Sequence, residues 1–218
     1  MSRDRALAQV ADFSALVRRL EARLTAPLPG PAAHAALTPR PRGDWPAGFR
    51  PARLRHAAGL LLVFPYDRRP HVVLTRRADT LGRHAGQVSL PGGAIEPGET
   101  EEQAALREAH EETALALDDV RVLGALTPVD LPASGFRLHP IVAALDRPPA
   151  LRAADGEVAG ILEVAVDTLV VRSHLVTLER MHNGRPIVVP AFQVAGADIW
   201  GATAMVLAEF LTLLGWRV

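Results

Sequence analysis

The stretch from Gly93 to Leu115 constrains the fold more than any other part of the chain. Leu90-Pro91-Gly92-Gly93 predicts the end of a strand and a tight turn, and Pro97-Gly98 predicts a second turn. Thr100 is followed three residues later by Gln103, which is a capping box and predicts that a helix begins here. A strand, a glycine loop and a capped helix in this order favour a pocket over a flat surface.

The predicted helix carries three carboxylates on one face. Glu108 and Glu112 are four residues apart, and Glu111 is three residues from Glu108. Like charges at this spacing repel by about 0.2–0.5 kcal/mol per pair, so the arrangement gains nothing in folding. Hard divalent cations take oxygen ligands, so we interpret the face as a site for Mg²⁺ or Mn²⁺. The alternative is a solvated acidic helix face.

Small and apolar side chains complete the predicted helix. We expect Ala104 and Ala105 to leave open space over the acidic face. Leu106, Ala109 and Thr113 lie on the opposite side of the helix, and we expect them to pack against a sheet.

This stretch resembles the Nudix box, G-x5-E-x7-R-E-U-x-E-E-x-G-U, in which U is aliphatic. The matching residues are Gly93, Glu99, Arg107, Glu108, Glu111, Glu112 and Leu115. Ala109 stands where a larger aliphatic side chain is usual, and Ala114 replaces the late glycine. The resemblance implies an α/β/α sandwich with a mixed sheet and a metal-dependent pyrophosphatase. It also implies that the Gly93 carbonyl joins Glu108, Glu111 and Glu112 as a metal ligand.

The same resemblance implies roles for other charged residues. A bound divalent ion would lower the pKa of a water molecule that attacks phosphorus. We expect Glu99 and Arg107 to form an ion pair that orients the loop on the helix, with direct catalysis as the alternative. The candidates for the general base are Glu111 and a carboxylate of a downstream loop, of which Glu157 is the first choice and Glu163 the second.

A second motif lies just upstream and is similar to the signature of the coenzyme A pyrophosphatase branch, roughly L-L-T-x-R-[SA]-x-x-L-R-x-H-x-G-x-V-x-F-P-G-G. The residues that agree are Thr75, Arg77, Ala78, Leu81, His84, Gly86, Val88, Pro91, Gly92 and Gly93. Gly82 stands where the pattern has Arg, and Leu90 replaces Phe. This resemblance implies cleavage of coenzyme A and its derivatives to 3′,5′-ADP and 4′-phosphopantetheine.

Four basic side chains near this motif are candidate substrate ligands. Arg76, Arg77, Arg83 and His84 offer donors for phosphate oxygens, and Arg binds phosphate in a bidentate manner. The alternatives are solvent-facing charges and, for His84, a structural histidine. Two other functions remain open: hydrolysis of another nucleotide derivative such as ADP-ribose, and a non-catalytic nucleotide-binding module.

Net charge and cysteine content limit the classes of binding partner and chemistry that we expect. The chain has 218 residues, a formal net charge of zero and no cysteine. Bulk charge therefore gives no reason to expect binding to nucleic acid or to an anionic membrane, and thiol chemistry is excluded. No apolar run reaches transmembrane length, and residues 1–24 lack the apolar core of a signal peptide. We expect a cytoplasmic enzyme that acts on a small molecule.

The pattern along the chain predicts two parts, an N-terminal helix and arm at 1–54 and the hydrolase domain at 55–218. Apolar residues at helical spacing predict an amphipathic helix over 5–24, which either packs on the domain or makes a homodimer contact. Residues 25–53 are rich in proline, so we expect an extended arm.

Strands and one further helix are predicted in the rest of the domain. The predicted strands are 57–64, 71–76, 87–90, 120–126, 136–145, 175–180 and 187–194, with a strand or short helix at 164–171 and a closing helix at 201–214. Residues 66–70 and Asn183-Gly184 predict hairpin turns. Residues 127–135 and 146–156 are expected to be loops.

Overall fold

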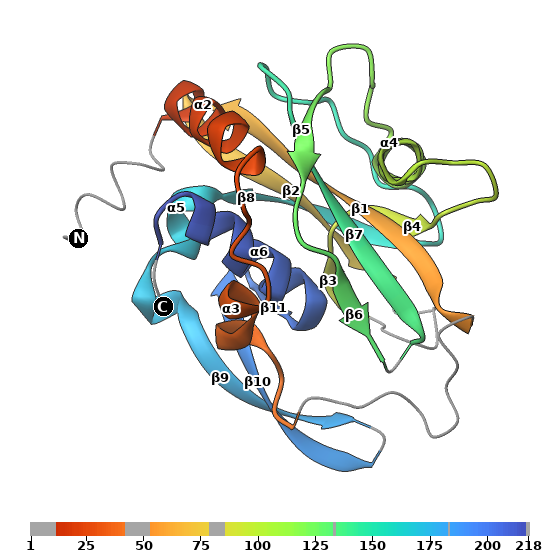
Figure 1. The fold of residues 1–218 in the computed structure, drawn as a ribbon, viewed down its shortest axis with the longest axis vertical. Helices are drawn as coiled ribbons and strands as arrows, with labels where there is room; N and C mark the ends of the chain where they lie inside the picture. Colours follow the sequence, from red (N-terminus) through yellow and green to blue (C-terminus); the bar gives the residue numbers. More distant parts are fainter. Residues whose placement is uncertain (1–11, 42–52, 79–85, 133, 183, 217–218) are drawn as a thin grey trace.

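The computed structural model describes residues 12–41, 53–78, 86–132, 134–182 and 184–216. Within these ranges the strands form an eight-stranded mixed sheet and a separate three-stranded antiparallel sheet (Figure 1). The strands of the larger sheet are β1 (Arg55–Tyr66), β2 (Arg69–Arg77), β3 (Val88–Ser89), β4 (Gly92–Ala94), β5 (Arg121–Ala125), β6 (Val129–Leu131), β7 (Phe136–Ala144) and β8 (Val158–Ala165). The smaller sheet comprises β9 (Leu175–His182), β10 (Arg185–Val194) and β11 (Ala197–Trp200).

Helices cover both faces of the larger sheet. The helices are α2 (Phe13–Leu24), α3 (Pro31–His34), α4 (Glu101–Thr113), α5 (Val166–Leu169) and α6 (Gly201–Leu213), with 3-10 turns η1 (Ala35–Leu37) and η3 (Arg172–His174). In Figure 1, α4 lies on one side of the sheet, and α2 and α6 lie on the other. The predicted layered α/β architecture with a mixed sheet is therefore confirmed. No helix in the described ranges is long and apolar enough to cross a membrane.

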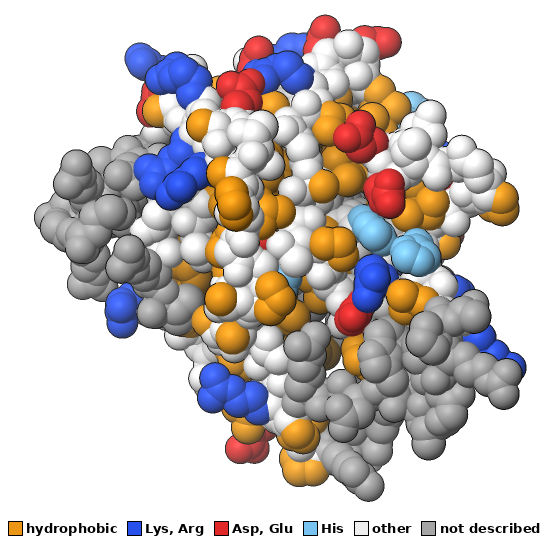
Figure 2. Space-filling view, viewed as in Figure 1, with side chains coloured by type: hydrophobic (Ala, Val, Ile, Leu, Met, Phe, Trp, Pro, Cys, Tyr) orange, Lys and Arg blue, Asp and Glu red, His pale blue; other side chains and the backbone are white. Residues whose placement is uncertain are grey.

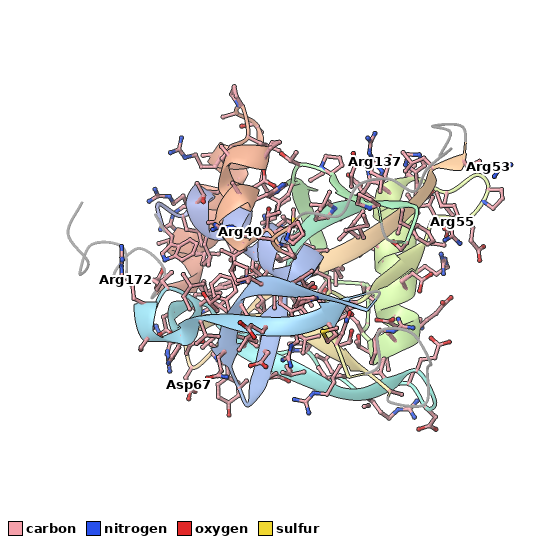
Figure 3. The ribbon with its side chains drawn as sticks, turned by 90° about the horizontal axis from the view of Figure 1, so that it is seen from below. Arg40, Arg53, Arg55, Asp67, Arg137 and Arg172 are labelled. Atoms are coloured by element: carbon pink, nitrogen blue, oxygen red, sulfur yellow. The ribbon has the colours of Figure 1, made fainter. Side chains whose placement is uncertain are left out.

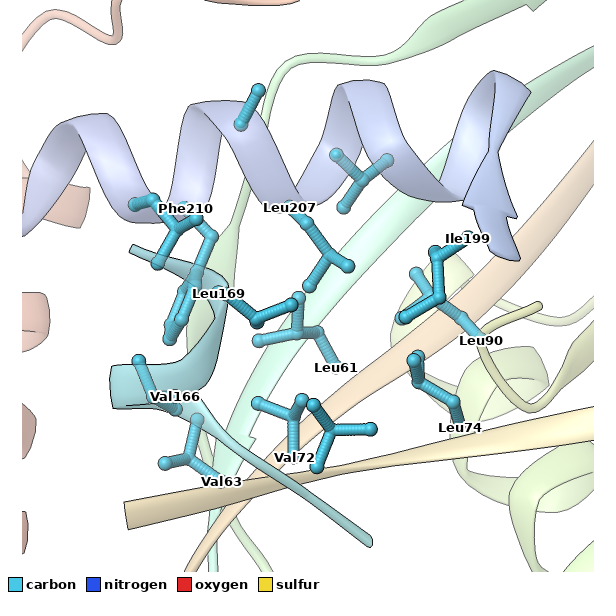
Figure 4. Close-up of a cluster of buried hydrophobic side chains, with 14 of the residues drawn as sticks. Leu61, Val63, Val72, Leu74, Leu90, Val166, Leu169, Ile199, Leu207 and Phe210 are labelled. Carbon is cyan, nitrogen blue, oxygen red and sulfur yellow. The ribbon is translucent and has the colours of Figure 1, made fainter. Parts of the chain in front are cut away.

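Strand β1 is the centre of the fold because it is buried on both faces. Leu60 and Leu62 face α4, whereas Leu61 and Val63 face the opposite layer, as the alternation of side chains along a strand requires. Figure 4 shows Leu61 beneath Leu207 of α6, and Val63 beside Val166 of α5. Burial on both sides explains why this strand is a continuous apolar run in the sequence.

The partners of β1 change along its length, and this change creates the site. β7 runs parallel along one edge of β1. On the other edge β4 pairs with residues 57–59, and β2 pairs with residues 63–66. The segment 88–94, which contains β3 and β4, is therefore inserted between β1 and β2 where these strands diverge. The glycine loop predicted from the sequence is this segment.

The N-terminal helix differs from the prediction. Asp12 is extended and its side chain caps Ala15, so α2 begins at Phe13 and a single helix over 5–24 is wrong. Residues 5–11 lie outside the described ranges. The apolar side chains Phe13, Leu16, Val17 and Leu20 are buried within the chain. This face of α2 is therefore used for packing on the domain, and the homodimer stays a prediction.

The proline-rich arm is less extended than predicted. Pro31 is the first residue of α3, a position where its missing N–H costs nothing, and η1 follows directly. Arg40 then pairs with Val188 of β10. Residues 42–52 lie outside the described ranges. The arm is held by Glu209 of α6, whose carboxylate accepts hydrogen bonds from the Gly30 N–H at 2.9 Å and from His34 Nε2 at 2.9 Å.

Four strands were missed or misplaced by the prediction, and the first is β4, which lies where a tight turn was predicted. β6 lies within the predicted loop at 127–135, and β11 was not predicted. β8 occupies 158–165 and was missed except for its last two residues, whereas the short-helix alternative predicted at 164–171 is confirmed by α5. Short strands carry little pattern of their own and depend on their partners, here β7, β10 and β2.

Candidate active site

Helix α4 has the predicted capping box. The Thr100 hydroxyl accepts from the Gln103 N–H at 3.2 Å, and the Gln103 side chain accepts from the Thr100 N–H at 2.9 Å. The prediction for Ala104 and Ala105 was wrong, because both are fully buried against the sheet and leave no open space. Their small size instead lets the helix approach β1 and β4 closely.

Glu108 lies directly against the glycine loop. A Cβ atom placed on Gly93 would come within 2.4 Å of the Glu108 carboxyl carbon. A Cβ atom on Gly92 would come within 2.3 Å of the Ala58 carbonyl oxygen. A side chain at Gly92 would therefore clash with the backbone of β1, and a side chain at Gly93 would displace the Glu108 carboxylate. Gly93 provides the space for the Glu108 carboxylate, and Gly92 allows the loop to pair with β1.

Glu112 is the most unusual carboxylate of the acidic face, because it is only 7% exposed. Its Oε2 accepts from the Gly92 N–H at 3.3 Å and from the Thr75 hydroxyl at 3.5 Å. The pKa of Glu112 is raised to about 7, chiefly by burial and also by the nearby charge of Glu108, while the Gly92 hydrogen bond and the charge of Arg77 act in the opposite direction. A buried carboxylate with so little compensation is suited to bind a cation.

Arg107 joins the loop to the helix. Its guanidinium donates to Glu99 Oε1 at 2.7 Å and to Glu99 Oε2 at 3.0 Å, so the predicted ion pair is present. The same group donates to Glu108 at 2.9 Å, to Glu111 at 3.2 Å and to the Ala94 carbonyl at 3.1 Å. Arg107 therefore fixes the loop on α4 and also holds two carboxylates of the acidic face.

Of the four basic candidates, the structure places Arg77 next to the acidic face. Its charge acts on Glu112, and its buried Nε has no hydrogen-bond partner within the described ranges. Arg76 projects from the other face of β2, the one that carries Leu74, because side chains alternate along the strand. Arg83 and His84 lie outside the described residues.

Glu157 reaches the site through a loop that is bound to α4. The Ala154 N–H donates to the Glu112 carbonyl at 2.9 Å, and the Glu157 carbonyl accepts from the Ala78 N–H at 2.9 Å. Gly156, with φ of +87°, makes the turn between them. The Glu157 side chain is exposed, and its charge contributes to the raised pKa of Glu112. The loop thus places near the acidic face a carboxylate that forms no ion pair with the described residues.

A second group of basic side chains lies near the start of β1 and β7. Figure 3 shows Arg53, Arg55 and Arg137 at the same end of the molecule. Arg137 is paired with Asp130 at 2.7 Å, and the Arg55 guanidinium lies 3.9 Å from the centre of the Phe136 ring. These contacts give Arg55 and Arg137 a structural role at the end of the sheet, and we assign neither residue a role in the acidic site.

The acidic face fits a hard divalent cation by its chemistry. It offers the carboxylates of Glu108, Glu111 and Glu112, together with the carbonyl of Gly93, and these are oxygen ligands. In the described ranges no three acidic or histidine side chains already lie close enough together to hold an ion. Glu111 is instead bound to Arg107, so we expect it to exchange this partner when a cation binds.

Two residues of the site were missed as contacts of Glu112. Thr75 and Gly92 were noted in the sequence only as members of the upstream motif. The signal that would have identified Thr75 is a hydroxyl inside an apolar strand, since a buried polar group requires a partner.

Comparison with known proteins identifies the family. The family model for the NUDIX domain matches residues 53–186. "Uncharacterized Nudix hydrolase NudL" of Pectobacterium atrosepticum is 32% identical over 167 residues, covering 75% of this chain and 85% of its own length. The protein of the same name in Klebsiella pneumoniae (strain 342) is 35% identical over 179 residues, covering 78% of this chain and 91% of its own.

Solved structures agree on the fold. The crystal structure of the Nudix hydrolase RenU from M. smegmatis superposes with a TM-score of 0.51 at 22% identity, covering 82% of this chain and 93% of its own. A MutT/nudix family protein from Enterococcus faecalis gives a TM-score of 0.50 at 17% identity, covering 79% of this chain and 66% of its own. The chain belongs to the Nudix family, and it is a hydrolase that acts on the phosphoanhydride bonds of nucleoside diphosphate derivatives.

Proposed function

We propose that this enzyme hydrolyses coenzyme A and its derivatives to 3′,5′-ADP and 4′-phosphopantetheine. The observation that carries the proposal is the upstream motif, which ends in the glycine loop and includes Arg77. This arginine lies beside Glu112 and has a buried, unused donor within the described ranges. A pyrophosphate bound at the acidic face would supply the missing acceptor.

The metal is proposed to be Mg²⁺ or Mn²⁺, held by Glu108, Glu111 and Glu112 with the Gly93 carbonyl. When bound, such an ion offsets the charge of a pyrophosphate and lowers the pKa of a water molecule. Arg107 and Glu99 keep the loop that carries Gly93 in place. Their part in catalysis is thus to orient the ligands.

Substrate contacts are proposed for the basic side chains. Arg77 donates to oxygens of the pyrophosphate, where its planar guanidinium can bind in a bidentate manner. Arg76, Arg83 and His84 are proposed to contact the rest of the substrate. For Arg76 the contacted group must lie beyond the sheet face that carries Leu74, since its side chain projects there.

The general base is proposed to be Glu157, with Glu111 as the alternative. Glu111 is bound to Arg107 at 3.2 Å, so it would have to give up this ion pair to accept a proton. Glu157 is exposed, lies on a loop bound to α4 and acts electrostatically on Glu112. It can therefore take a proton near the acidic face without giving up an ion pair.

The substrate is proposed to be a small molecule and not a nucleic acid. On the face seen in Figure 2, acidic and basic side chains are interspersed, and the described part of this face carries no broad basic area. A nucleic-acid site would require such an area.

The test is product analysis with parallel substrates. Purified protein with Mg²⁺ or Mn²⁺ is offered coenzyme A, ADP-ribose and diadenosine polyphosphates. The proposal predicts the highest kcat/KM for coenzyme A, with 3′,5′-ADP and 4′-phosphopantetheine as products. A preference for ADP-ribose would contradict it and would assign the enzyme to another branch of the family.

A second comparison tests recognition of the 3′-phosphate. A charge-assisted hydrogen bond from arginine contributes about 1.5–3 kcal/mol. We therefore expect coenzyme A to be hydrolysed with a higher kcat/KM than 3′-dephospho-coenzyme A. Equal kcat/KM values for the two compounds would show that the enzyme does not recognise the 3′-phosphate.

A further inference from the structure

Thr75 is a buried hydroxyl at the edge of the acidic face. It is 1% exposed and lies on the side of β2 that faces α4. Its Oγ1 lies 3.3 Å from Ser89 Oγ and 3.5 Å from Glu112 Oε2. A buried hydroxyl requires partners, and the described contacts of Thr75 are these two.

The direction of these hydrogen bonds follows from the chemistry of the groups. A carboxylate that holds a cation is ionised and only accepts, so in that state the single proton of the Thr75 hydroxyl is donated to Glu112. The Thr75 oxygen can then accept, and Ser89 must be its donor. Ser89, Thr75 and Glu112 thus form a chain of hydroxyls that ends on one carboxylate oxygen.

The same carboxylate oxygen receives a second donor from the sheet. The Gly92 N–H lies 3.3 Å from Glu112 Oε2, whereas Oε1 takes part in no hydrogen bond within the described ranges. Glu112 is carried by α4, but its contacts at Oε2 come from β2 and from the inserted segment 88–94. The sheet therefore holds one oxygen and leaves the other available.

We propose that Thr75 is a positioning residue that, with Ser89 and Gly92, fixes the Glu112 carboxylate so that Oε1 is presented to the metal. This inference rests on the proposed metal site but not on the identity of the substrate. Hydrogen bonds behind a ligand orient it, and losing one typically reduces metal affinity about 10–100-fold. Thr75 touches neither the substrate nor the ion, so it acts through Glu112.

The chain provides a matched control. Thr203 is also buried, at 7% exposure, and its hydroxyl donates to the Val88 carbonyl at 3.1 Å, next to Ser89 in the sequence. Thr75→Val and Thr203→Val therefore make the same chemical change in the same neighbourhood. Only the first removes a donor to the acidic face.

The experiment measures Mn²⁺ binding by the full chain without substrate, by electron paramagnetic resonance of the free ion. Thr75→Val is expected to lower the Mn²⁺ affinity about 10–100-fold. Thr75→Ser keeps the hydroxyl and is expected to restore the affinity of the wild type. Thr203→Val is expected to leave the Mn²⁺ affinity unchanged. Thermal unfolding of each variant confirms that the protein measured is folded.

Wild-type affinity in folded Thr75→Val would overturn the proposal, as would an equal loss in Thr203→Val. If Thr75→Val does not fold, Ser89→Ala decides, because it removes the donor to Thr75 at a half-buried site. Weaker Mn²⁺ binding by Ser89→Ala supports the proposal, and unchanged binding overturns it. Since no substrate is present, a preference for ADP-ribose would refute the proposed function without affecting this result.

Discussion

Two buried glutamates of this enzyme have opposite environments. Glu209 of α6 is fully buried and accepts from the Gly30 N–H, His34 Nε2, the Thr127 N–H and the Thr127 hydroxyl, at distances of 2.7–3.2 Å. Glu112 of α4 is nearly as buried, but its two donors both lie on one oxygen, at 3.3 and 3.5 Å. Within the described chain both oxygens of the first carboxylate accept hydrogen bonds, whereas only one oxygen of the second does.

The pKa values follow this difference. Burial alone would raise the pKa of Glu209, but the hydrogen bonds from His34, Thr127 and Gly30 bring it below its ordinary value. For Glu112 burial prevails and raises the pKa to about 7. A satisfied buried carboxylate stabilises the fold. A buried carboxylate whose pKa is raised by burial costs free energy to ionise and is retained where a ligand can compensate it, which is the physical basis for assigning function to α4 rather than α6.

The largest effect is expected from the acidic face itself. Glu108→Gln and Glu112→Gln should each lower kcat by more than about 100-fold, because both side chains are proposed metal ligands. Losing a residue that only supports a metal ligand typically costs about 10–100-fold in activity, and losing the ligand itself should cost more. Circular dichroism should show an unchanged fold. Near-wild-type turnover of either variant at saturating metal would show that the residue is not a metal ligand. For Glu112 it would also remove the functional difference from Glu209.

The general base gives the next effect. Glu157→Gln preserves size and hydrogen bonding but removes basicity, so kcat should fall roughly 10²–10⁴-fold with little change in KM. Steady-state kinetics of Glu157→Gln and Glu111→Gln, side by side, separate the two candidates. A nearly silent Glu157→Gln beside an inactive Glu111→Gln would place the base on α4.

Glu209 should control stability instead of turnover. Glu209→Ala leaves His34, Thr127 and the Gly30 N–H without their acceptor, so the free energy of unfolding should fall by about 3–5 kcal/mol. The kcat of the folded fraction should not change. Glu163→Ala is the matched control, because Glu163 is exposed and its loss should stay within about 0.5 kcal/mol. Similar urea midpoints for the two variants would contradict the structural role of Glu209.

The low pKa of Glu209 also predicts an acid dependence. Its folded value lies below the ordinary value of 4.5, so its stabilising effect is present above pH 4.5 and is lost as the pH falls through the folded value. Urea unfolding between about pH 3 and 6 should therefore show a steeper acid-side loss of stability in the wild type than in Glu209→Gln. Equal slopes for the two proteins would show that Glu209 does not bind protons differently on unfolding.

The smallest effect concerns the end of α4. Ala114 has φ of +53°, where the Nudix pattern has glycine, and this conformation costs an L-residue about 1–2 kcal/mol. Ala114→Gly relieves this strain, but glycine also gains about 0.4–1 kcal/mol of entropy in the unfolded chain, which acts against it. The free energy of unfolding should therefore rise by up to about 1 kcal/mol. Ala116→Gly, at an exposed position outside the positive-φ residues, should instead be destabilising. A loss of stability in Ala114→Gly would refute this reading of the helix end.

The contrast between the two glutamates also separates what the sequence predicts from what it does not. The helix and its carboxylates were predictable because the signals are local, from the capping box at Thr100 to the spacing of Glu108 and Glu112. The role of Glu209 was not predictable in this way, because its partner His34 lies 175 residues away in an arm that was predicted to be extended. The same holds for Thr75, which reaches Glu112 only after β2 and α4 have packed.

Metal binding by three proteins tests the central claim most directly. Mn²⁺ affinity is measured for the wild type, Glu112→Gln and Glu209→Gln, without substrate and at a temperature where all three are folded. The account predicts that Glu209→Gln binds Mn²⁺ as tightly as the wild type, and that Glu112→Gln binds at least about 10-fold more weakly. Wild-type affinity in Glu112→Gln, or an equal loss in both variants, would contradict it.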